Sequence, residues 1–81
     1  MLAATATPPT ATAEEIRTLE TLLDEEMLGW AAVHYVIIRC IWRLDWTEFK
    51  TREVLRAAER TGSSRLEIVR RPGGPYVRLA P

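Results

Sequence analysis

The sequence predicts a small α+β domain in which three helices are followed by a C-terminal β-hairpin. The chain has 81 residues, 47% of them hydrophobic, which is enough for one domain with a thin core. Between residues 12 and 62, helix-start signals are followed by apolar residues at three- and four-residue spacing. Two runs of β-forming residues then meet at a Pro-Gly-Gly-Pro sequence, residues 72–75. These observations favour helices first and a hairpin last.

The first helix is expected to begin at Ala13. Thr12 and Glu15 form a capping box, in which the hydroxyl accepts one free backbone amide and the carboxylate accepts the amide of the cap. Gly29 is a weak point for the helix. Residues 1–11 are rich in Ala, Thr and Pro and are expected to be a disordered tail, so the domain covers residues 12–81. The apolar face of this helix consists of Ile16, Leu19, Leu23, Met27 and Trp30.

Residues 30–44 (WAAVHYVIIRCIWRL) predict a second helix that is buried on most sides. Fifteen residues without a turn signal exceed the usual length of a strand. The many β-branched residues also allow a strand over residues 33–42 as an alternative, and the element order would then be αβαββ. In either case we expect His34 to be a hydrogen-bonded core residue and Cys40 a small buried hydrophobe.

A third helix is expected to open at Trp46 or Thr47, with Asp45 as its cap and Glu48 completing the capping box. It should end at Gly62, because glycine favours the position after a helix. Basic residues repeat at every fourth position on one side and predict an exposed basic stripe formed by Arg52, Arg56 and Arg60. The opposite, apolar face consists of Thr51, Val54, Leu55, Ala58 and Thr61.

The hairpin is predicted from alternation with period two. Leu66 and Ile68 on one strand should face Val77 and Leu79 on the other. The connection at 72–75 supplies glycines for positive φ and prolines that stiffen its flanks. Three arginines cluster around this tip: Arg70, Arg71 and Arg78.

In this order of elements the sequence resembles the winged helix-turn-helix superfamily. Residues 45–46 would be the turn, residues 47–60 (TEFKTREVLRAAER) the recognition helix and residues 69–77 (VRRPGGPYV) the wing, and the likeness covers residues 13–80. The resemblance implies binding of double-stranded DNA, with the recognition helix in the major groove and the wing on the phosphate backbone or minor groove. It also implies a small transcriptional regulator or a DNA-binding accessory factor.

The charge distribution indicates either a polyanionic partner for the basic half or acidic and basic faces that meet within or between chains. Residues 1–38 hold one base and six acids, whereas residues 39–81 hold ten bases and five acids. Arginine suits phosphate because its guanidinium group binds two oxygens at once. An alternating Arg/Glu face can equally be a solvated surface with weak ion pairs. The residues predicted to bind nucleic acid are Lys50, Arg52, Arg56, Arg60, Arg70, Arg71 and Arg78.

A second hypothesis is a protein interaction module or homodimeric adaptor without a nucleic-acid role. Three tryptophans are a large aromatic mass for so thin a domain, and tryptophan often anchors interfaces. A homodimer would be held by the first two helices, with an interface predicted at Ile16, Leu19, Leu23, Met27 and Trp30.

Other classes of function find little support. No set of residues combines a nucleophile, a base and an oxyanion donor, so we expect no enzyme, no cofactor and no small-molecule substrate. A single cysteine and a single histidine do not make a metal site, and they weakly favour a reducing, cytoplasmic compartment. The start of the chain lacks the features of a signal peptide. The apolar run at 27–42 is shorter than the roughly 20 residues of a membrane span, so we expect no membrane partner.

Overall fold

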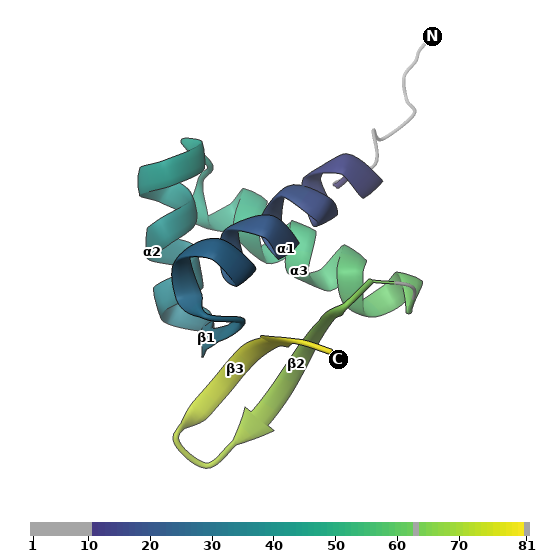
Figure 1. Cartoon of the computed structure of the whole chain (residues 1–81). Helices are drawn as coiled ribbons and strands as arrows, with labels where there is room; N and C mark the ends of the chain where they lie inside the picture. The colour runs from purple at the N-terminus through teal and green to yellow at the C-terminus, as the bar shows by residue number, and fades with distance from the viewer. Residues whose placement is uncertain (1–10, 63, 81) are drawn as a thin grey trace, which may run out of the picture.

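The computed structural model of the chain describes residues 11–62 and 64–80, and the fold is α+β as predicted. Three helices are followed by a hairpin, and one additional short strand precedes the second helix (Figure 1). Most of the predicted tail lies outside the described residues, but Ala11 packs against the core. The elements are α1 (Ala13–Met27), β1 (Trp30–Ala32), α2 (Val33–Leu44), α3 (Glu48–Thr61), β2 (Leu66–Arg71) and β3 (Gly74–Leu79).

The three strands form one antiparallel sheet in the order β1-β3-β2. The tip of the β2–β3 hairpin extends away from the three helices (Figure 1). The hairpin is confirmed, and its register pairs Leu66 with Leu79 and Ile68 with Val77, the residues expected to face one another. The connection is a turn at Pro72 and Gly73, and among its glycines only Gly74 has a positive φ, 124°.

The core lies between the helices and the inner face of the sheet. Leu19 and Leu23 of α1, Val36 of α2, Val54 of α3 and Val77 of β3 are each 0% exposed. All three helices and the sheet therefore contribute to one hydrophobic cluster, which is what a chain of this size needs to be stable. No helix within residues 11–62 and 64–80 has both the length and the apolar character needed to cross a membrane.

Helix α1 begins as predicted. The Thr12 hydroxyl accepts a hydrogen bond from the Glu15 amide at 3.1 Å, and the Glu15 carboxylate accepts one from the Thr12 amide at 2.9 Å. The helix ends when Leu28 adopts a left-handed conformation with φ 57°, followed by Gly29 with φ 86°. Both amides donate to the Leu23 carbonyl, which satisfies an acceptor at the helix end.

The helix predicted over residues 30–44 is confirmed for residues 33–44, so the alternative of a strand over 33–42 is wrong. The first three residues differ from the prediction, because Trp30–Ala32 form the short strand β1. The helix is also not buried on most sides. His34 is exposed instead of lying in the core, and the other side of α2 buries Val33, Val36, Ile37 and Cys40.

The cap of α3 is Thr47, not Asp45. The Thr47 hydroxyl accepts a hydrogen bond from the Lys50 amide at 3.0 Å, and the helix begins at Glu48. Asp45 instead ends α2 in a left-handed conformation with φ 57°. The C-terminal end at Gly62 is confirmed, while Thr61 is exposed and does not belong to the buried face.

Candidate nucleic-acid interface

An open groove of about 490 Å³ runs between α3 and the β2 strand of the hairpin. Its floor is apolar and its walls are mainly basic, with Glu59 as its one acidic lining residue. The groove is lined by Val33, Arg52, Leu55, Arg56, Glu59, Ile68, Arg70, Arg71 and Pro75.

Two regular elements bring the arginines together. Arg52 and Arg56 lie one turn apart on α3, on the side opposite the buried Val54 and Ala58. Arg70 lies two residues beyond Ile68 on β2, so both side chains point to the same face of the sheet, toward α3. Arg52 and Arg70, which are 18 positions apart in the sequence, therefore line a single groove.

Three of the four groove arginines form ion pairs within the chain. Arg52 binds Glu48 at 2.9 Å, Arg70 binds Glu59 at 3.1 Å, and Arg56 binds Glu53. The side chains of Arg52, Arg70 and Arg56 remain 49%, 69% and 59% exposed. Solvent therefore screens these pairs, and they are weak. Arg71 has no acidic partner in the described ranges.

The other three predicted residues lie outside the groove. Lys50 binds Glu15 of α1, and its ammonium group lies 6.0 Å from the centre of the Trp46 ring. Arg60 is exposed near the end of α3. Arg78, which lies on β3, binds Glu67 at 2.8 Å. The seven predicted residues are thus not one surface, and four of them share the groove.

The ion pair of Glu15 and Lys50 also changes the pKa of the Glu15 carboxyl. The side-chain hydrogen bond from Lys50 lowers the pKa of the Glu15 carboxyl below its usual value, and the backbone amide of Thr12 contributes in the same direction. This lysine therefore helps to connect the starts of α1 and α3. Lys50 is better placed to support the fold than to reach a ligand of the groove.

The outer face of the sheet holds a second hollow, of about 410 Å³. The sequence gives no sign that Trp30 meets Tyr76, yet their ring centres lie 5.6 Å apart with planes inclined by 32°. The relationship arises because β1 pairs with β3, which places Ala32 opposite Tyr76 and Trp30 opposite Arg78. A three-residue strand leaves too short a pattern to be read from sequence. The hollow is lined by Trp30, Val69, Arg71, Tyr76 and Arg78.

The structure places the residues of the predicted dimer interface differently from the expectation. Ile16, Leu19, Leu23 and Met27 are at most 8% exposed and belong to the core of the single chain, so they offer no surface to a partner. Trp30 is 59% exposed. The exposed large apolar side chains are Leu28, Trp30, Tyr35, Ile38, Ile41, Trp42 and Phe49.

Comparisons of this chain with protein-family models, with curated proteins and with solved structures find no match. Within the described part of the chain, no three His, Cys, Asp or Glu side chains gather in a way that would hold a metal ion.

Proposed function

We propose that this protein binds double-stranded DNA through the groove between α3 and the hairpin. The observation that carries the proposal is the convergence of Arg52, Arg56, Arg70 and Arg71 from two elements on one open groove. A helix and an adjoining ribbon that both present guanidinium groups can contact the two sides of a DNA groove. In this proposal the chain is a winged helix-turn-helix protein, α3 enters the major groove and the hairpin is the wing.

The intramolecular ion pairs are compatible with this function. Exposed Arg–Glu pairs contribute about 0–1 kcal/mol, whereas each phosphate contact also releases condensed counterions from the duplex. Phosphate oxygens can therefore replace Glu48, Glu53 and Glu59 as partners at small cost.

The two elements take different roles in the proposal. Arg52 and Arg56 project from a helix that fits the major groove, where arginine reads the acceptor edge of guanine. Arg70 and Arg71 lie next to the turn at the tip of the hairpin and contact phosphate. Such a chain suits a small transcriptional regulator or an accessory factor that places larger proteins on DNA.

The test is a fluorescence anisotropy titration of a random-sequence duplex at about 50 and 200 mM salt. The two phosphate contacts of Arg70 and Arg71 give a slope of about −1.8, which corresponds to roughly a tenfold loss of affinity between these conditions. Replacement of all four groove arginines by Ala should remove this binding. The matched control is Arg17→Ala, because Arg17 is exposed on α1 and does not line the groove.

A flat titration at low salt for the folded protein would refute DNA binding and leave the second hypothesis, a protein interaction module without a nucleic-acid role. A specific observation favours that alternative as well, because α2 exposes several large apolar side chains. An exposed contiguous apolar patch on a small domain often marks an interaction site.

A further inference from the structure

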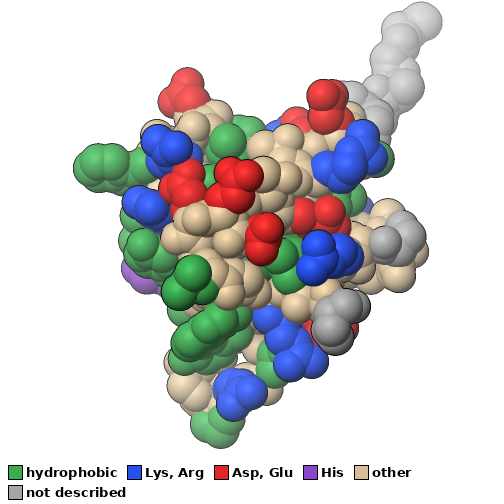
Figure 2. Space-filling view, in the orientation of Figure 1, with side chains coloured by type: hydrophobic (Ala, Val, Ile, Leu, Met, Phe, Trp, Pro, Cys, Tyr) green, Lys and Arg blue, Asp and Glu red, His purple; other side chains and the backbone are tan. Residues whose placement is uncertain are grey.

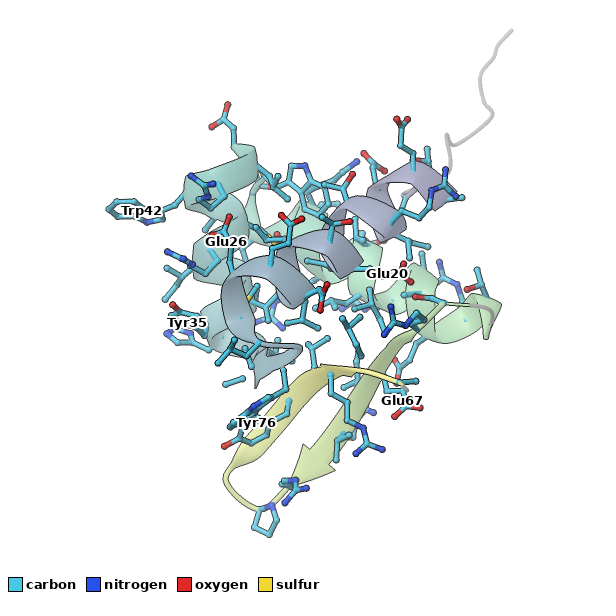
Figure 3. The ribbon with its side chains drawn as sticks, viewed as in Figure 1. Glu20, Glu26, Tyr35, Trp42, Glu67 and Tyr76 are labelled. Carbon is cyan, nitrogen blue, oxygen red and sulfur yellow. The ribbon has the colours of Figure 1, made fainter. Side chains whose placement is uncertain are left out.

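Helix α2 exposes an apolar stripe on the side that faces away from the core. The stripe consists of Tyr35, Ile38, Ile41 and Trp42, which are 45%, 38%, 42% and 81% exposed. In Figure 3, Tyr35 and Trp42 lie on the outer side of α2, and the Trp42 ring extends from the body of the domain. Apolar side chains gather over the same side of the molecule in Figure 2.

The stripe follows helical spacing. Tyr35, Ile38 and Ile41 follow one another at three-residue spacing, and Trp42 lies four positions after Ile38, so the four side chains form one ridge along two turns of α2. The opposite face of the same helix is buried and also apolar. A helix that is hydrophobic on all sides is normally covered on all sides. Within the described chain, however, only one face of α2 is covered.

The two arginines beside the stripe are paired within the chain, but with a single carboxylate. Arg39 and Arg43 both bind Glu26 of α1, at 3.0 Å and 2.8 Å. The Arg39 guanidinium also lies 5.8 Å from the centre of the Tyr35 ring. Two arginines share one carboxylate, so one net positive charge remains at the edge of the ridge, while the ridge itself is apolar.

The exposed area is large for so small a chain. From the exposed fractions, the four side chains of the stripe present roughly 450 Å² of surface. A standard interface buries about 800 Å² per partner, so the stripe supplies about half of one before its polar border is counted. An interface of this size is at the small end of specific contacts, so we expect a weak association.

We propose that the α2 stripe is the two-fold interface of a homodimer of this chain. Two antiparallel α2 helices would pack ridge against ridge, with each stripe covered by its own copy. An apolar ridge on a helix is complementary to itself, and both arginines beside it are already bound to Glu26. The dimer does not depend on DNA binding, because the groove and the stripe share no residue.

The first experiment measures mass by light scattering or sedimentation equilibrium, without DNA, between about 10 and 500 µM. The wild type should approach about 18 kDa, twice the 9.2 kDa of one chain. The double variant Ile38→Glu, Trp42→Ser should raise the dimer dissociation constant by about a hundredfold or more, because it places charge in the centre of the interface. Circular dichroism verifies that this variant remains folded.

The matched control is Phe49→Ser, since Phe49 is 70% exposed but lies on α3 outside the stripe. It should leave the dissociation constant within about threefold of the wild type. A wild type that remains at 9.2 kDa at the highest concentration overturns the proposal. So does an association that is unaffected by the stripe variant. A monomer that binds phosphatidylcholine vesicles through the stripe would assign the surface to lipid instead.

A second measurement tests the symmetry. In an antiparallel pair, residues near the middle of the stripe lie close to their counterparts, so Ile38→Cys should form a covalent dimer on oxidation with copper phenanthroline. The native Cys40 is 0% exposed and should not react. Arg17→Cys, an exposed position on α1, is the control. Equal crosslinking of the two variants would contradict a specific two-fold contact at α2.

Discussion

The Glu20 carboxylate of α1 accepts a hydrogen bond from the Ser64 hydroxyl at 2.8 Å, across 44 positions of sequence. The same oxygen accepts the Arg65 amide at 3.0 Å, and the Ser64 hydroxyl in turn accepts the Leu66 amide at 3.0 Å. Glu20 lies beside the segment that leads into β2 (Figure 3). One carboxylate on the first helix thus fixes the base of the hairpin on which the groove depends.

Glu20→Ala should lower the free energy of unfolding by about 1.5–3 kcal/mol, because it removes hydrogen bonds to a charged acceptor and leaves the Arg65 amide unpaired. The measurement is urea unfolding at neutral pH. Glu25→Ala is the control, because Glu25 is an exposed acid on the same helix, and its effect should remain within about 0.5 kcal/mol. Equal effects of the two substitutions would show that the base of the hairpin is held by other contacts.

The double variant Arg70→Ala, Arg71→Ala should weaken DNA binding by a similar factor for all duplex sequences. If each arginine binds one phosphate, the salt slope should become shallower by about 1 for every phosphate that the variant no longer binds. Anisotropy titration of the random-sequence duplex at low and moderate salt measures both quantities. Unchanged affinity and slope in a folded variant would mean that these arginines only keep the tip of the hairpin soluble.

Arg52→Ala and Arg56→Ala should act differently from the hairpin variants. An arginine that reads a guanine contributes about 1–3 kcal/mol of discrimination, so its removal should relax the preference for one base pair. Selection of binding sites from a randomised duplex pool, performed with wild type and each variant, would reveal the change. A uniform decrease in affinity across all sites would assign these residues to phosphate contacts instead.

Local sequence patterns predicted the positions of the helices and strands better than the tertiary contacts that these elements make. The capping box of Thr12 and Glu15 depends on residues three positions apart, so it can be read from sequence and is confirmed. The hairpin register follows from alternation and a turn, which are also local. In contrast, β1 exists because Trp30, Ala31 and Ala32 pair with β3, more than 40 positions further along the chain.

The faces of the helices were harder to predict for the same reason. The composition of α2 indicates an apolar helix but not which side the rest of the domain covers, so the exposure of Trp42 was missed. The basic residues on α3 and in the hairpin were identified, but their separation into groove and non-groove positions depends on tertiary packing. Lys50 shows this most clearly, since Glu15 of another helix binds it.

The reassigned helix cap provides a direct comparison of two neighbouring residues. Thr47→Ala should destabilise the protein by about 1–2 kcal/mol, because it removes the acceptor for the Lys50 amide. Asp45→Gly should be neutral or stabilising, because glycine adopts the φ of 57° at this position more readily than aspartate. Thermal unfolding of both variants measures the difference. The opposite order would restore Asp45 as the cap.

Burial of Cys40 predicts a specific loss of stability in alkali. Burial raises the pKa of the Cys40 thiol from its usual 9.0 to about 11. Between these values the unfolded chain loses the proton while the folded chain keeps it, so stability should fall as pH rises from 9 to about 11. Below pH 9 this residue should have no effect on the pH dependence.

Urea unfolding of wild type and Cys40→Ala at pH 8 and pH 10.5 isolates the contribution of Cys40 to the free energy of unfolding, which should be about 1–2 kcal/mol at the higher pH. Parallel decreases in the two proteins would show that tyrosine and lysine titration, common to both, accounts for the loss.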